Sequence, residues 1–277
     1  MRIDAHQHFW KYSKEEYGWM QTAGLEMLRR NFLPQDLQME MDDVDIEGVI
    51  AVQARQTLDE TRWLLELAEK HVFIKGVVGW IPLASPEVTA ALTEFSDSTL
   101  LRGVRHVLHD EKDDHYMLRP RFNEGIALLK ECNLVYDILI FDRHLPQTIQ
   151  FVDMHPEQPF VLDHMAKPRI AEGEIEPWET NIRELARRPQ VTCKVSGMVT
   201  EADWTRWSVE ALKPYFDVVL EAFGPDRLMF GSDWPVCLVA AEYQKWAEAA
   251  EDLADGLSDD EFKALFGGTA ARVYGLK

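Results

Sequence analysis

Residues 3–10, Ile-Asp-Ala-His-Gln-His-Phe-Trp, decide between the two folds that the alternation of elements along this chain allows. The segment has the apolar character of a buried first strand, and it ends in His6 and His8. An open, doubly wound α/β sheet normally places a glycine-rich phosphate-binding turn after its first strand. Because histidines stand there instead, the segment favours a closed (β/α)8 barrel.

Eight short apolar runs alternate with longer segments that have the period of an amphipathic helix. The predicted strands are residues 3–9, 48–54, 74–82, 101–108, 135–140, 160–165, 191–197 and 228–232. The predicted helices are residues 57–70, 86–95, 121–131, 145–154, 178–187, 204–222, 242–253 and 258–274. Eight strands separated by helices are the pattern of an α/β protein of the (β/α)8, or TIM barrel, type.

Residues 18–40 do not fit this repeat, and we predict an elaborated loop there, with a short helix near residues 26–30, over the top of the barrel. The last helix begins with a Ser-x-x-Glu capping box formed by Ser258 and Glu261. No linker or change of composition divides the chain, so we predict one domain over residues 1–277.

The composition restricts the partners. The 277 residues include 48 acidic and 29 basic side chains, and the formal net charge of −19 disfavours nucleic acid and anionic membranes as partners. We expect no signal peptide, because no apolar run follows the first residues, and no segment is apolar enough to span a membrane. Cys132, Cys193 and Cys237 do not form a disulfide pattern. We expect a cytoplasmic protein with a small-molecule partner; whether it forms a homo-oligomer is left open.

In a (β/α)8 barrel the functional side chains lie at the C-terminal ends of the strands. His6 and His8 are two positions apart, so both are expected to face the barrel interior. Asp233 follows the eighth predicted strand in Gly-Ser-Asp-Trp-Pro, and Pro235 argues against a helix beginning at Asp233. We therefore predict that Asp233 is a general base at the mouth of the barrel rather than a helix cap.

Two pairs of adjacent residues are ambiguous, because neighbours on a strand point to opposite faces. Of Asp163 and His164 we expect His164 to face the barrel, with a capped loop histidine as the alternative. Arg105 and His106 pose the same question, which the sequence leaves open; Arg105 could hold a substrate oxygen or pair with a carboxylate.

The predicted substrate-binding residues share a position near the strand ends. They are Gln53, Trp80, Arg105, His106, Lys194 and Trp234. Lys194 is a charge within an apolar strand, and burying it without a partner would be costly, which favours a lumen position with a partner or ligand. Trp10, Trp19, Trp80 and Trp234 could present flat apolar surfaces to a sugar ring, although packing alone explains most tryptophans in a chain that has nine.

Five segments together resemble a known family. They are residues 3–10, Leu-Asp-His-Met-Ala-Lys-Pro at 162–168, Cys-Lys-Val-Ser-Gly at 193–197, Met-Phe-Gly-Ser-Asp-Trp-Pro at 229–235 and Gly-Thr-Ala-Ala-Arg-Val-Tyr-Gly-Leu at 268–276. The chain resembles the amidohydrolase superfamily (amidohydrolase family 2) over residues 3–276, and more narrowly its sugar-lactone hydrolases, of the L-fuconolactonase and L-rhamnonolactonase type.

The resemblance implies roles for four residues: His6 and His8 as the first-strand pair, His164 as the sixth-strand histidine and Asp233 as the eighth-strand acid. It implies one divalent metal ion, Zn²⁺, on His6, His8 and Asp233, which is dispensable in some relatives, and no organic cofactor. Metal-rich relatives have a bridging ligand on strand four and a histidine on strand five. This chain has Asp137 on strand five, which argues against a binuclear centre.

The implied activity is that of a carboxylic ester hydrolase in carbohydrate metabolism, such as L-fucose degradation. Water activated by Asp233 would attack a lactone carbonyl polarised by histidines, a metal or both. One alternative is a dicarboxylate or muconolactone-type lactonase, for which only Arg55 and Arg105 look well placed. Others are a metal-dependent decarboxylase on the same barrel and a non-catalytic sugar-acid sensor, which would tolerate the loss of Asp233.

Overall fold

Eight parallel strands form one continuous sheet in chain order in the computed structural model, which describes residues 1–276. The strands are β1 (Ile3–Gln7), β2 (Gly48–Val52), β3 (Ile74–Gly79), β4 (Leu101–Val107), β5 (Val135–Leu139), β6 (Phe160–Leu162), β7 (Val191–Val195) and β8 (Leu228–Phe230). The segment after β8 joins β1: the Asp233 amide donates to the His6 carbonyl at 2.7 Å, and the His8 amide donates to the Trp234 carbonyl at 2.7 Å. The predicted (β/α)8 barrel is confirmed.

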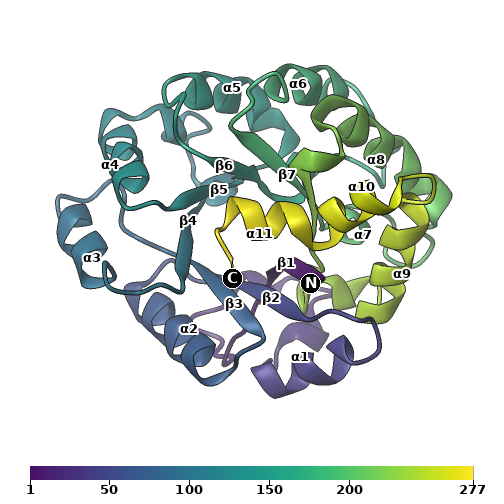
Figure 1. The fold of residues 1–277 in the computed structure, drawn as a ribbon, viewed down its shortest axis with the longest axis horizontal. Helices are drawn as coiled ribbons and strands as arrows, with labels where there is room; N and C mark the ends of the chain where they lie inside the picture. The colour runs from purple at the N-terminus through teal and green to yellow at the C-terminus, as the bar shows by residue number, and fades with distance from the viewer. Residues whose placement is uncertain (277) are drawn as a thin grey trace.

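Helices surround the sheet (Figure 1). They are α1 (Pro34–Met41), α2 (Leu58–Lys70), α3 (Val88–Glu94), α4 (Pro120–Glu131), α5 (Leu145–Asp153), α6 (Trp178–Leu185), α7 (Met198–Glu201), α8 (Val209–Phe223), α9 (Tyr243–Leu253), α10 (Asp259–Lys263) and α11 (Thr269–Val273). Among residues 1–276, no helix has both the length and the apolar character needed to cross a bilayer.

The eight predicted strands are all present, and most of the predicted helices begin and end within a few residues of the observed ones. Each strand ends one to three residues earlier than predicted, because the residues at its C-terminal end leave the sheet to build the mouth. Two helices, α1 and α7, were not predicted, and α8 begins at Val209 rather than at residue 204 because the Ser208 side chain caps it. The predicted loop helix near residues 26–30 is a short 3-10 turn, Glu26–Leu28.

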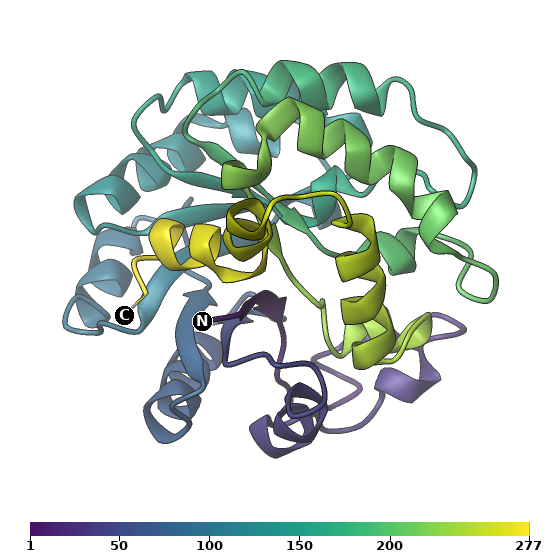
Figure 2. The same ribbon diagram turned by 45° about the vertical axis from the view of Figure 1, so that its right-hand side comes forward.

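The predicted last helix is confirmed at its start, where Ser258 and Glu261 form the capping box, but it is not continuous. A π-type turn, Ala264–Gly268, separates α10 from α11. A Cβ atom at Gly267 would lie 2.2 Å from the Met1 carbonyl oxygen, so this turn needs glycine to pass the N-terminus. As a result α11 lies across the N-terminal end of the barrel, beside the first residue (Figures 1 and 2).

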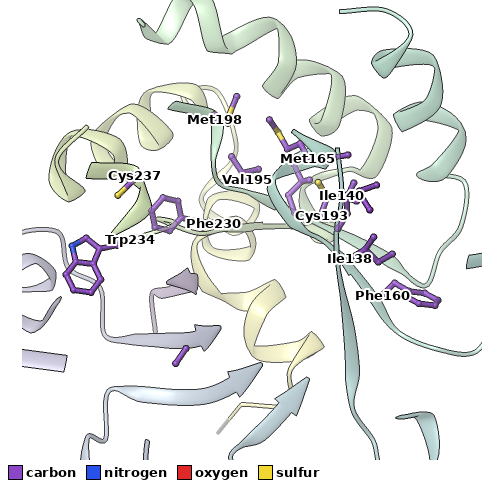
Figure 3. Close-up of a cluster of buried hydrophobic side chains, with 14 of the residues drawn as sticks. Ile138, Ile140, Phe160, Met165, Cys193, Val195, Met198, Phe230, Trp234 and Cys237 are labelled. Atoms are coloured by element: carbon purple, nitrogen blue, oxygen red, sulfur yellow. The ribbon is translucent and has the colours of Figure 1, made fainter. Parts of the chain in front are cut away.

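The sheet has an apolar layer on its outer face and a smaller apolar cluster inside. Figure 3 shows part of the outer layer, to which Cys193 and Val195 of β7 and Phe230 of β8 contribute. The inner cluster fills the lower lumen and is closed by α11; its members are Ile3, Ala5, Ile50, Val52, Val78, Val135, Val161, Met229, Ala270 and Tyr274. Above this cluster the lumen is lined by charged side chains, which form the floor of the mouth.

We predict that Gly125→Ala destabilises the protein, although alanine normally favours a helix interior over glycine by about 1 kcal/mol. Gly125 lies in α4, and a Cβ atom there would lie 2.2 Å from the Leu83 carbonyl oxygen. Because backbone must move to admit it, we expect the free energy of unfolding to fall by about 3 kcal/mol in urea denaturation. Glu124→Ala, at an exposed position of the same helix, is the control and should change it little.

Candidate active site

The C-terminal ends of the strands enclose a cavity of about 230 Å³ at the mouth of the barrel. Its lining residues are His8, Trp10, Trp19, Gln53, Ala54, Arg105, Val107, His109, Asp110, Leu139, His164, Lys167, Asp233 and Val236. The cavity combines apolar walls with a few convergent polar groups, which is the usual character of a small-molecule site.

The four predicted catalytic residues converge in and below this cavity. The Nε2 atoms of His6 and His8 are 3.2 Å apart. Asp233 Oδ1 lies 3.4 Å from His8 Nε2 and 3.8 Å from His6 Nε2. His164 completes the group, with Nε2 3.9 Å from the same carboxylate oxygen.

His6 faces the lumen because β1 is irregular. Ile3 and Ala5 pack inside the barrel, whereas Asp4 points outward to Ser232 and Tyr243. The register of β1 against β2 shifts between Asp4 and Gln7, so His6 also lies on the inner side although it is next to Ala5. Such a bulge redirects a side chain without breaking the sheet.

Asp4, which is fully buried, fastens this bulge to the segment that carries Asp233. Its Oδ1 accepts the His6 amide at 3.0 Å and the Ser232 amide at 2.8 Å, and its Oδ2 accepts the Ser232 hydroxyl at 2.5 Å. Burial raises the pKa of Asp4 to about 6, against the effect of these hydrogen bonds. Asp4 therefore connects β1 to β8 directly behind the site.

Asp233 is ionised at neutral pH. Burial alone would raise the pKa of this carboxyl, but the adjacent His164, His8 and His6 together outweigh burial and hold the pKa well below its usual range. Its backbone is in the left-handed region, with φ of 58°, which a non-glycine residue adopts at a cost when the surrounding structure requires it.

His164 is neutral at the same pH. Burial lowers the pKa of His164 to about 4, against the attraction of Asp233. Its Nδ1 lies 2.8 Å from the hydroxyl oxygen of Ser196, a fully buried residue that orients the ring. Burial also lowers the pKa of His6 well below its ordinary value, so a carboxylate anion faces neutral imidazoles.

A left-handed turn places His164. Residues 164–167 all have positive φ, between 50° and 61°, although none is glycine. Each such residue costs about 1–2 kcal/mol. Two features stabilise the turn. Trp178 donates from Nε1 to the Met165 carbonyl at 2.7 Å. Gly197 leaves room for the His164 imidazole, because a Cβ atom at Gly197 would lie 2.8 Å from His164 Nδ1.

This turn corrects the prediction that only His164 of the pair faces the barrel. β6 ends at Leu162, so the alternation rule no longer applies to the two residues that follow. Asp163 points into the lumen, where its Oδ2 accepts from Arg105 Nη1 at 3.0 Å. Asp163 was thus missed as a site residue, although the same sequence motif contains it.

The ambiguity between Arg105 and His106 is resolved by the pleat of β4. Arg105 points inward and donates from Nη2 to Gln53 Oε1 at 2.9 Å, and both residues line the cavity. His106 points outward: its Nε2 lies 2.7 Å from Glu111, and its ring stacks on Tyr116.

Four predicted substrate-binding residues lie outside the cavity, which corrects the expectation of direct contact. His106 packs behind β4, and Trp80 donates from Nε1 to His106 Nδ1 at 3.4 Å. Trp234 is 1% exposed, and its ring packs against Phe9 and Phe32. Lys194 is completely buried beneath His6 and pairs with carboxylates there.

His109, Asp110 and Lys167 line the cavity, and the sequence reasoning missed them. His109 and Asp110 follow the predicted fourth strand directly, so their position at a strand end was the available signal. Burial lowers the pKa of His109 to about 3, with Lys167 adding to the effect, and the imidazole stacks on Phe141. His109 is therefore a neutral polar group in the wall.

The donor atoms of His6, His8 and Asp233 fit a divalent metal ion. Ligand atoms about 2.1 Å from a tetrahedral zinc ion lie about 3.4 Å from one another, close to the observed separations of 3.2, 3.4 and 3.8 Å. His8 Nδ1 lies 2.8 Å from the Val52 carbonyl, so it donates there and leaves Nε2 free as a ligand atom. Arg105 Nη1, however, lies 3.2 Å from His6 Nε2 and competes for the same lone pair.

The chain is similar over its whole length to known proteins of one family. The model of the amidohydrolase family matches residues 3–276. An L-fucono-1,5-lactonase from Burkholderia multivorans is 45% identical, covering 100% of this chain and 96% of that protein. An L-fucono-1,5-lactonase from Burkholderia ambifaria is 36% identical, covering 99% of this chain and 95% of that protein. A crystal structure of a Burkholderia multivorans amidohydrolase with bound zinc superimposes with a TM-score of 0.95 at 44% identity, covering 100% of both chains.

We predict that His164 makes the folded protein less stable in mild acid. An unfolded histidine has a pKa of about 6.5, whereas the folded pKa is about 4, so the unfolded chain takes up the proton first as the pH falls. The stability is complete above pH ~6.5 and is lost between that pH and ~4. At pH 5 this residue should cost about 2 kcal/mol of unfolding free energy, measured by urea denaturation.

The control is His164→Gln, whose amide does not titrate. Other buried histidines contribute to the pH dependence of both proteins, so the difference between the two isolates His164. If wild type and variant lose the same free energy between pH 7.5 and pH 5, the burial argument for His164 is wrong.

Proposed function

The chain belongs to the amidohydrolase family, and on that premise we propose that it is a lactonase that opens sugar lactones of the L-fucono-lactone type to the free sugar acid. The observation that carries the proposal is the convergence of ionised Asp233 with His6, His8 and His164 at the mouth of the barrel. The full-length similarity to two L-fucono-1,5-lactonases supports the substrate class.

In the proposed mechanism Asp233 first acts as general base. Its carboxylate takes a proton from water, and the water oxygen attacks the lactone carbonyl carbon, so that the carbonyl electron pair moves onto oxygen. The ring N–H group of neutral His164 donates a hydrogen bond to this developing oxyanion. Ser196 supports the role of His164, because a hydroxyl that donates to Nδ1 leaves the proton on Nε2, toward the site.

Asp233 then acts as general acid. When the tetrahedral intermediate collapses, the bond between the former carbonyl carbon and the ring oxygen breaks, and the protonated Asp233 gives its proton to that oxygen. The product is a hydroxy acid that ionises in solvent. The low pKa of Asp233 keeps it ionised for the first step but makes it a weak base, so the attacking water has to be activated as well.

We propose that His6, His8 and Asp233 can hold a zinc ion. A divalent ion there would supply Lewis acidity, polarising the carbonyl and lowering the pKa of water. Two neutral imidazoles and a carboxylate are a common ligand set for zinc. Because Arg105 competes for the His6 lone pair, we propose that this ion is not indispensable.

The charge of the cavity favours a neutral substrate over a dicarboxylate. Arg105 is paired with Asp163, and Lys167 donates to Glu201 at 2.7 Å, so the cations at the cavity are already neutralised. Gln53 and Arg105 are placed to bind lactone oxygens, and Trp10 and Trp19 to face the apolar side of a sugar ring. We therefore propose a role in carbohydrate breakdown, with L-fucose as the candidate sugar.

We predict that Asp233→Asn lowers kcat by about 10²–10⁴ and leaves the fold intact, because the amide cannot take the proton from water. The measurement is acid release from L-fucono-lactone in weakly buffered indicator, with circular dichroism as the check on folding. Asp226→Asn, at an exposed carboxyl, is the matched control and should retain wild-type rates. Near-normal turnover by Asp233→Asn would rule out this mechanism.

We also predict a substrate and metal profile. Among L-fucono-, L-rhamnono-, L-galactono- and D-arabinono-lactones and a muconolactone, the neutral sugar lactones should be hydrolysed and the muconolactone should not. Measurable activity should survive chelation. If only the muconolactone, which carries a carboxylate, is hydrolysed, the substrate assignment is wrong. If chelation abolishes activity and added zinc restores it, the ion is essential.

A further inference from the structure

Lys194 is the central cation of the barrel interior. Its neighbours Cys193 and Val195 belong to the apolar layer outside the sheet (Figure 3), and Lys194 points the other way, into the lumen. The side chain is 0% exposed. It lies beneath His6 and outside the cavity, so it cannot contact a substrate there.

Three atoms surround the ammonium group. Nζ lies 2.5 Å from Asp137 Oδ2, 2.9 Å from Asp163 Oδ1 and 3.2 Å from His6 Nδ1. The two carboxylate oxygens accept hydrogen bonds from the ammonium group, and the His6 ring nitrogen lies beside it. Two carboxylate oxygens and an imidazole nitrogen are also atoms that bind divalent transition metals.

The surroundings close this site from below. Tyr274, just after α11, donates its hydroxyl to Asp137, with distances of 2.9 and 2.8 Å to the two carboxylate oxygens. Asp137 and Tyr274 are both buried, so solvent does not screen the carboxylate. Without a cation, Asp137 and Asp163 would be two buried like charges, which is an unfavourable arrangement.

A second cation completes the charge balance. Arg105 Nη1 donates to Asp163 Oδ2, so two carboxylates are matched by one ammonium and one guanidinium. The donor atoms of His6, Asp163 and His164, a set without Asp137, lie within 4.8 Å of one another, as a metal site would require. An ion bound to that set would add a third positive centre beside Lys194 and Arg105.

We propose that the ammonium group of Lys194 occupies a buried cation site formed by Asp137, Asp163 and His6. In this role Lys194 is a positioning residue: it holds the His6 ring from the Nδ1 side and takes the place that a second metal ion would otherwise fill. The barrel then accepts at most one exogenous ion, at His6, His8 and Asp233. The proposal rests on buried contacts, and it does not depend on the lactonase activity.

The test is the zinc content of the full chain. Wild type and Lys194→Ala are stripped with chelator, equilibrated with zinc chloride and freed of unbound metal, and zinc per chain is measured by mass spectrometry. Alanine removes the charge and opens space between the ligand atoms. We expect wild type to hold no more than one zinc per chain and Lys194→Ala to hold one more, with a larger rise of its Tm on adding zinc.

Two variants separate charge from space. Lys194→Met removes the charge but fills the space, so it should lose stability without gaining zinc. Lys194→Ala combined with Asp137→Asn removes a ligand, so the additional zinc should disappear. If Lys194→Ala is unfolded when stripped, zinc should restore its circular dichroism spectrum, because the ion supplies the missing charge.

Three results would overturn the proposal. The first is a second zinc in wild type, which would show that Lys194 does not exclude it. The second is a Lys194→Ala chain with no more zinc than wild type, or one that zinc does not fold. The third is equal zinc uptake by the Ala and Met variants. Lactonase activity can be present or absent in all of these, so failure here is distinct from failure of the proposed function.

Discussion

The pairing of charges inside the barrel is the constraint on which the site depends. Asp163 accepts from Arg105 and lies 2.9 Å from Lys194 Nζ, and both cations also reach the ring nitrogens of His6. Breaking one buried ion pair by removing a partner typically costs about 3–5 kcal/mol, so these side chains stay together and hold the imidazole rigidly. The polar network therefore forms a rigid layer between the inner apolar cluster and the cavity at the mouth.

Two departures from regular strand geometry direct functional side chains into the lumen. The bulge in β1 turns His6 inward beside Ala5, and the left-handed turn after β6 lets Asp163 and His164 both enter the barrel. Each departure is stabilised elsewhere, by Asp4 in the first case and by Gly197 with Trp178 in the second. Strain that persists at a site because the surroundings require it is common in functional regions.

Much of the fold and part of the site followed from local pattern. Apolar runs located all eight strands, and the histidines at the end of the first strand pointed to a closed barrel. Strand-end position already singled out His164 and Asp233, the resemblance gave them roles, and the structure brings both to His6 and His8. The errors concern direction for Trp80, His106 and Trp234, because strand-end position does not tell which way a side chain points. Lys194 faces the lumen with carboxylate partners, as predicted, but it lies below the cavity rather than in it.

The sequence by itself determined the order and class of the elements, because hydrophobic period and turn composition are local properties of the chain. It also placed His6 and His8 at the end of the first strand, whereas the inward direction of His6 depends on the bulge in β1. Only the tertiary structure decided that Asp163 enters the lumen, that His109 and Lys167 form the cavity wall, and that Lys194 lies under His6. These outcomes depend on charges and packing contributed by strands that are far apart in the sequence, and no local pattern contains that information.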